Sequence, residues 1–154
     1  MSQYAKDTNV PIERSKAEIE RLLMQNGAES IYTGMEKARA SIAFRLKGYN
    51  IIFRIAMPDP NSTRFTHSHN GARRRSNEAA YKEWEQGCRE RWRCLFLCIK
   101  AKIHAIDSRV ETFEQAFMPH IMMPNGQTVA EMALPAIKQS YESNGEPPLQ
   151  LGLY

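Results

Sequence analysis

The chain has 154 residues, 42% hydrophobic and 25% charged, which is typical of a globular domain with a sizeable core. No apolar stretch is long enough to span a membrane, and the polar start MSQYAKDTNV lacks the apolar region of a signal peptide. We therefore expect a cytosolic protein without membrane contacts. The length suits a single domain over 1–154, with flexible segments expected at 1–13, 59–76 and 145–154.

The first expected element is a helix over about 16–26. Ser15 and Glu18 have the spacing of a capping box, and Asn26-Gly27 is a typical helix stop. A short strand over about 30–35 follows.

A hairpin is the next expected element. Apolar residues alternate over 40–46 and 51–57, and a tight turn at Lys47-Gly48 would place Phe44 opposite Ile51. One face would then join the core. The other would carry Arg45 and Arg54, as a solvated face or as a ligand surface.

A polar loop, NSTRFTHSHNGARRR, begins at residue 61 and has no periodicity. It is either disordered or ordered by a partner. Its arginines suit the phosphates of a nucleic acid, and Phe65 could stack on a base.

His67 and His69 suggest a metal site only weakly, because no placed carboxylates accompany them. The chain has no glycine-rich phosphate loop, nucleophile elbow or HExxH motif. We expect no metal, no cofactor and no enzymatic activity. A small-molecule binder or hydrolase that uses the two histidines stays open as a further alternative.

A long helix is expected over about 77–110. Its apolar face would comprise Trp84, Cys88, Trp92, Leu95, Ile99, Ile103 and Ile106. A basic sector beside that face would comprise Lys82, Arg89, Arg93, Lys100 and His104. This sector is either a track for phosphates or an ordinary solvated face.

Charge is unevenly distributed along the chain. Residues 64–110 contain eleven Lys or Arg and five acids, 11 − 5 = +6, whereas residues 111–154 contain one Lys and five Glu, 1 − 5 = −4. The positive middle favours a polyanion as partner, and the opposite charges of the two parts favour head-to-tail self-association.

Three cysteines, Cys88, Cys94 and Cys98, lie on this helix. The odd count and the lack of a loop framework predict reduced, buried thiols.

Two further capping boxes, Thr112 with Gln115 and Thr128 with Glu131, predict a short helix and a last helix to about residue 143. Residues 120–123 are expected to be extended. The predicted fold is α+β: a small antiparallel three-stranded sheet crossed by a long helix, in the order α-β-β-β-α-α-β-α.

Several segments resemble a family of small, uncharacterised phage and prophage proteins. These segments are VPIERSKAEIERLL, RASIAF, IIFRIAMPDP, RWRCLFLCIKAK and TFEQAFMPHIMMPNGQTV. The resemblance implies the cytoplasm of an infected or lysogenic bacterial host as the setting, and it implies no activity.

In topology alone, three antiparallel strands followed by a long helix are similar to the core of single-strand annealing proteins of the Redβ and RecT kind. That resemblance implies a basic groove between hairpin and helix for single-stranded DNA, and rings or filaments as assemblies. The order is also similar to the double-stranded RNA-binding domain, although here the second helix is longer and more chain follows.

We therefore predict a phage-type nucleic-acid-binding protein that favours single-stranded DNA and acts in recombination or replication. The predicted binding residues are Arg45, Arg54, Arg64, Phe65, Arg73, Arg74, Arg75, Lys82, Arg89, Arg93 and Lys100. The alternative is a small viral inhibitor that binds a host protein, such as a defence effector or a polymerase.

Overall fold

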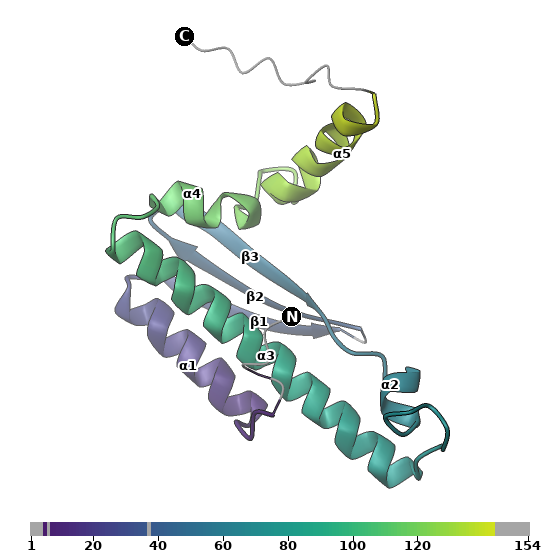
Figure 1. The fold of residues 1–154 in the computed structure, drawn as a ribbon. Coiled ribbons are helices and arrows are strands. Elements are labelled where there is room, and N and C mark those ends of the chain that lie inside the picture. The colour runs from purple at the N-terminus through teal and green to yellow at the C-terminus, as the bar shows by residue number, and fades with distance from the viewer. Residues whose placement is uncertain (1–4, 6, 37, 144–154) are drawn as a thin grey trace.

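The computed structural model describes residues 5, 7–36 and 38–143. Its elements are, in chain order, α1 (Ile12–Gln25), β1 (Ser30–Glu36), β2 (Arg39–Leu46), β3 (Tyr49–Ala56), α2 (Thr63–Thr66), α3 (Asn77–Asp107), α4 (Phe113–Phe117), the 3-10 helix η2 (Met118–His120) and α5 (Val129–Glu142). The predicted α+β class, a small antiparallel sheet crossed by a long helix, is confirmed (Figure 1).

The three strands form an antiparallel sheet in the order β1-β2-β3. Phe44 pairs with Ile51 and Ile42 with Phe53, as predicted from the apolar alternation. The turn between β2 and β3 has positive φ at both Lys47 (51°) and Gly48 (83°). Such a turn matches the twist of the two strands and fixes this register.

The helices cover one face of this sheet. Figure 1 shows α1 and α3 side by side across that face, with α4 at the C-terminal end of α3. Trp92 and Ile99 of α3 are fully buried there, as are Ile19 of α1 and Phe117 of α4. Phe117 packs edge-on against Phe44, with ring centroids 6.1 Å apart. The core therefore fills the space between the hairpin and α3.

The helix ends follow the predictions in part. The capping boxes at Thr112 and Thr128 are confirmed, with both reciprocal hydrogen bonds present in each. The predicted capping box at Ser15 was wrong, because α1 begins at Ile12 and Ser15 is a buried residue inside this helix. Proline has a φ suited to helix initiation, and Pro11 occupies the N-cap of α1.

The predicted fourth strand was also wrong. Residues 118–120 form η2, and the chain then makes only isolated bridges, from Ile121 to Ile51 and from Met122 to Thr128. An unexpected short helix, α2, lies within the polar loop, whose Ser62 hydroxyl accepts a hydrogen bond from the Arg64 N–H. The range 59–76 expected to be flexible is thus held by its own hydrogen bonds.

Helix α5 projects away from the body of the fold (Figure 1). It contains no buried residue, and Leu134, Ile137 and Tyr141 are exposed on it. At the other end of the chain, Ala5 is buried and α1 begins at Ile12, both within the range 1–13 that was expected to be flexible. The expected C-terminal tail, 145–154, lies outside the described residues.

Candidate nucleic-acid interface

The predicted binding residues lie on three surfaces and not in one groove. Arg45 and Arg54 alternate with the buried residues of β2 and β3, so they lie on the face of the sheet opposite α3. The predicted groove between hairpin and helix is therefore wrong, since apolar side chains occupy that space. We name the three surfaces by their residues: the seam (Arg89, Arg93 and Lys100), the loop surface (Arg64, Arg73, Arg74, Arg75 and Lys82) and the open sheet face, which carries Arg45 and Arg54.

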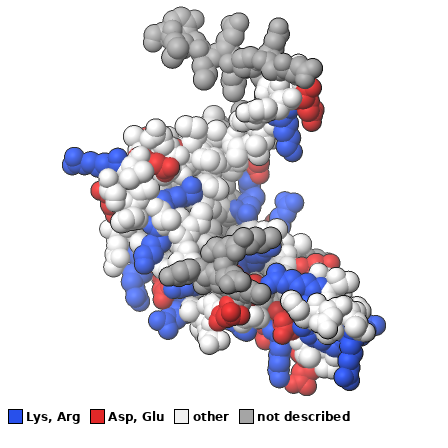
Figure 2. Space-filling view, viewed as in Figure 1, with Lys and Arg blue, Asp and Glu red and all other residues white. Residues whose placement is uncertain are grey.

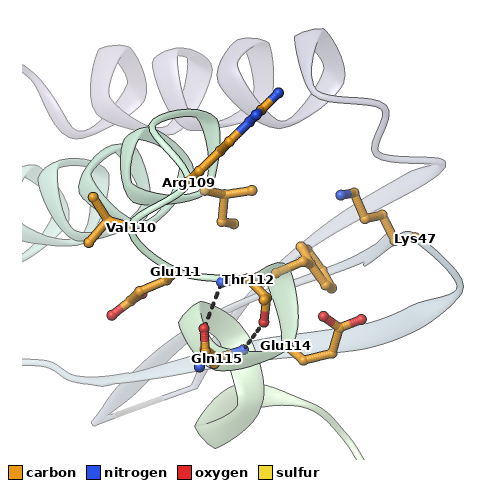
Figure 3. Close-up of a pocket in the computed structure, with 9 residues that line it drawn as sticks. Lys47, Arg109, Val110, Glu111, Thr112, Glu114 and Gln115 are labelled. Carbon is orange, nitrogen blue, oxygen red and sulfur yellow. Dashed lines mark hydrogen bonds between the residues drawn. The ribbon is translucent and has the colours of Figure 1, made fainter.

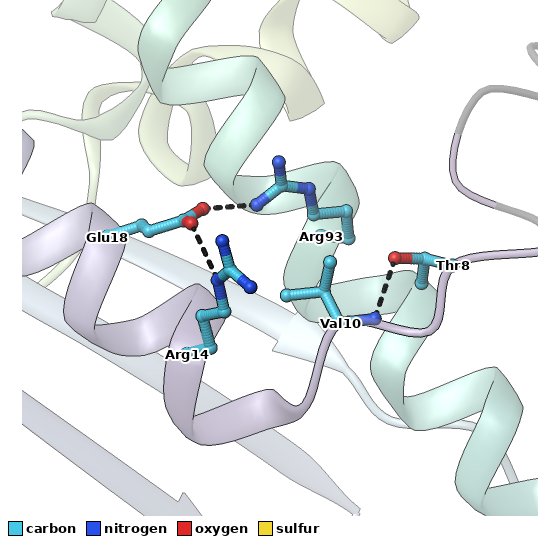
Figure 4. A network of polar contacts seen from close by, with 5 residues as sticks. All are labelled: Thr8, Val10, Arg14, Glu18 and Arg93. Carbon is cyan, nitrogen blue, oxygen red and sulfur yellow. Dashed lines mark hydrogen bonds and ion pairs between the residues drawn. The ribbon is translucent and has the colours of Figure 1, made fainter.

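The seam runs where α3 lies against α1. Glu18 of α1 accepts hydrogen bonds from Arg93 and from Arg14 (Figure 4). The Arg93 hydrogen bond is the main cause that lowers the pKa of the Glu18 carboxyl, so this carboxyl is ionised at neutral pH. Arg89 donates to the Gln86 side chain, and Lys100 lies 5.8 Å from the Phe96 ring centroid. Arg93 thus serves the α1–α3 contact, whereas the partners of Arg89 and Lys100 lie on α3 itself.

Phe65 does not fit the predicted role in base stacking. Its side chain is 3% exposed and packs against Gly87 of α3. It anchors α2 to α3, and a buried ring of this kind offers no face to a base. The sequence signal for burial was weak, because no periodicity surrounds Phe65.

Arg75 organises the loop surface. Its Nη1 donates to the backbone carbonyls of Arg64 (3.0 Å), Phe65 (3.1 Å) and His67. The Ser68 N–H also donates to the Arg73 carbonyl, and the Arg73 N–H donates to the Ser68 hydroxyl. The guanidinium of Arg75 therefore fixes the segment that carries Arg73 and Arg74.

Arg73 and Arg74 are exposed, and neither takes part in an ion pair among the described residues. Their neighbours differ: Arg64 pairs with Glu90 at 2.8 Å, and Lys82 pairs with Glu78 at 3.1 Å. On the face shown in Figure 2, basic and acidic side chains are accordingly mixed around α2 and the first turns of α3. The uncompensated charge of this surface lies in its arginine run.

The open sheet face carries a third group of cations. Arg45 lies 3.3 Å from Glu29, and Arg54 lies 2.7 Å from Glu131 at the start of α5. The backbone hydrogen bond from Thr128 is the main cause that lowers the pKa of Glu131. Two exposed residues of this face, Tyr32 and Arg39, were missing from the predicted site. Arg39 shares the face of Arg45 by the alternation of β2, whereas Tyr32 is identified by the register of β1 against β2, which the weak alternation of β1 did not specify.

The histidines show no arrangement suited to a metal. Across residues 5, 7–36 and 38–143, no group of three or more His, Cys, Asp or Glu side chains could hold a metal ion. His67 contacts the Thr66 hydroxyl at 2.9 Å. His120 stacks on Phe53, and its burial lowers the pKa of its imidazole to about 4. It therefore serves as a neutral packing group at neutral pH.

A shallow hollow of about 440 Å³ lies between the end of α3 and α4. Figure 3 shows Lys47 and Arg109 at its rim together with Glu111 and Glu114, while the Thr112–Gln115 capping box forms one wall. Its mixed charges and exposed position specify no ligand.

Of the three cysteines, Cys88 is buried while Cys94 and Cys98 are exposed, so the predicted burial holds for one of them. None of the helices in the described part of the chain combines the length and apolarity that a membrane crossing needs. No protein-family model, curated protein or solved structure matches the chain.

Proposed function

We propose that this chain binds nucleic acid through the loop surface and favours single-stranded DNA, with a role in phage recombination or replication. The observation that supports the proposal is the run Arg73-Arg74-Arg75. Three consecutive guanidinium groups lie there without a carboxylate within 4.0 Å among the described residues.

Uncompensated cations close together attract a polyanion by releasing its condensed counterions. Arg75 holds the loop by donating to carbonyl groups, which carry no net charge, so its positive charge remains available to the surroundings. A loop that is already fixed also loses less conformational entropy when a ligand binds than a disordered one would. Arg73 and Arg74 are therefore preorganised to contact phosphates.

The test replaces Arg73 and Arg74 together by Gln and measures binding of a labelled single-stranded oligonucleotide over a salt series. Each lost phosphate contact lowers the slope of log K against log salt by about 0.7 for a single strand, so the slope should fall by about 1.4. The matched control is Arg14→Gln with Arg21→Gln, which removes the same charge from the exposed side of α1. Equal slopes for the two double variants would contradict the proposal.

A protein partner is the second candidate function, because α5 contains no buried residue and exposes several large apolar side chains. Such a patch is typical of protein interaction sites. This candidate is the inhibitor of a host protein. In a pull-down from host lysate, the wild-type protein should still capture one host protein after nuclease treatment. The double variant Leu134→Gln with Ile137→Gln should no longer capture it.

A further inference from the structure

We infer that the open sheet face receives the unpaired bases of a single strand, which adds a base-contacting platform to the proposed phosphate contacts of the loop surface. The inference rests on the proposed function. It starts from the strand register, which arranges the side chains of this face in rows across the sheet. In chain order along β2, the rows are Glu36–Arg39–Ala56, Gly34–Ser41–Arg54, Tyr32–Ala43–Ile52 and Ser30–Arg45–Asn50.

The row of Tyr32, Ala43 and Ile52 is uncharged and largely apolar. Tyr32 is 70% exposed, although a tyrosine ring contributes most free energy when its faces are buried. Ala43 and Ile52 lie half-buried in the same row, so the surface beside the Tyr32 ring is apolar and does not protrude. Every base has an aromatic face, so a ring presented in this way can stack on a base of any sequence.

The neighbouring row leaves room for such a base. Gly34 and Ser41 are partners across β1 and β2, and a Cβ at Gly34 would lie 2.9 Å from the Ser41 Oγ. The small pair therefore keeps the surface beside Tyr32 low. Helices α1, α3 and α4 lie on the other side of the sheet (Figure 1), and α5 reaches this side at its first turn, through the ion pair of Glu131 with Arg54.

Arginines flank the apolar row on both sides. Arg45 is one row away in one direction and Arg54 one row away in the other, each about 6.7 Å along the strand. With Arg39 and Glu36 the strand residues of this face sum to 3 − 1 = +2, and the ion-pair partners Glu29 and Glu131 bring the sum to zero. A cation on either side of a stacked base suits the phosphates that precede and follow that base.

The ion pairs of these arginines do not prevent this contact. Both pairs, Arg45 with Glu29 and Arg54 with Glu131, have side chains that are between 35% and 59% exposed. Ion pairs at such exposure contribute little net free energy in water, so a phosphate can replace either carboxylate.

Duplex DNA cannot use this platform, because its bases are stacked on one another and paired inside the helix. The loop surface contacts phosphates of either form, whereas the apolar row of the open sheet face contacts only unpaired bases. The platform is thus the source of the preference for single strands.

The test compares two single-stranded probes of equal length, an oligothymidine and an abasic strand that has the same phosphates without bases. Wild-type protein should bind oligothymidine at least about fivefold more tightly than the abasic strand, which is the ratio expected from stacking of one base. Tyr32→Ala should remove most of this ratio by weakening oligothymidine binding alone. Tyr32→Phe, which keeps the ring, should retain it.

Tyr141→Ala is the matched control, because Tyr141 is 85% exposed on α5 and away from the sheet. An unchanged ratio in Tyr32→Ala would overturn the platform, while the salt slope of the arginine double variant would still report on the loop surface. A wild type that binds neither probe would overturn the platform together with the proposed function. An equal fall in affinity for both probes in a Tyr32→Ala variant whose urea unfolding curve matches that of the wild type would also overturn it, since that result indicates a purely electrostatic site.

Discussion

The Phe65 ring lies against Gly87 of α3 so closely that a Cβ at Gly87 would be 3.0 Å from two ring carbons. The contact joins α2, and through it the loop surface, to the long helix. A glycine within a helix usually costs stability relative to alanine, so its presence at this position is explained by the ring that covers it.

Gly87→Ala should therefore destabilise the protein although alanine favours helices. We expect a net loss of about 1 kcal/mol, since overpacking of about 1–3 kcal/mol outweighs a propensity gain of about 1 kcal/mol. Urea denaturation measures this loss. In a Phe65→Leu background the same substitution should cost less, and an equal cost in both backgrounds would show that the ring is not responsible.

Arg75 and Arg74 should differ in their effects, although they are neighbours. Arg75→Gln removes the hydrogen bonds to the carbonyls of Arg64, Phe65 and His67, so amide hydrogen exchange over residues 64–75 should become faster. Arg74→Gln removes the same charge without these bonds and should leave exchange unchanged. Equal protection in the two variants would indicate that the loop is held in another way.

Stability should fall as the pH is lowered from 6.5 to about 4 because of His120. Burial lowers the pKa of this imidazole to about 4 in the folded chain, against 6.5 for the exposed group. Between these values the unfolded chain binds a proton that the folded chain does not, so the free energy of unfolding rises with pH.

The control for this pH dependence is His120→Phe, which keeps a ring on Phe53 and cannot titrate. Urea denaturation at pH 7, 5.5 and 4.5 should show a smaller loss for the variant than for the wild type. Parallel pH profiles would assign the dependence to other groups.

Apolar residues of α5 and α4 should differ sharply in their contribution to stability. Phe117→Ala removes a fully buried ring and should cost about 3–5 kcal/mol. Leu134→Gln changes a side chain that is 49% exposed and should alter stability by less than about 0.5 kcal/mol. Thermal unfolding of the two variants checks this, and a large loss for Leu134→Gln would mean that α5 is covered in solution.

The hairpin and the last two helices were predictable because their signals are local. The alternation of apolar residues and the turn Lys47-Gly48 determine which residues of β2 and β3 face each other, and the capping boxes at Thr112 and Thr128 mark helix starts. The start of α1 was missed, because the Ser15 spacing resembles a capping box while Pro11 begins the helix.

The site was less predictable, because it depends on which face of an element meets the core. On a helical wheel Arg93 resembles a free cation, yet α1 places Glu18 beside it. Phe65 resembles an exposed loop aromatic, yet Gly87 provides the space that buries it. Such contacts join residues far apart in the sequence, and local periodicity carries no information about them.

The measurement that tests the central claim most directly is fluorescence anisotropy of the wild-type protein with labelled single-stranded DNA and with duplex DNA of the same length, over a salt series. We predict binding that weakens linearly in log K against log salt and that favours the single strand at every salt concentration. Absence of binding at low salt, or a preference for the duplex, would contradict this account.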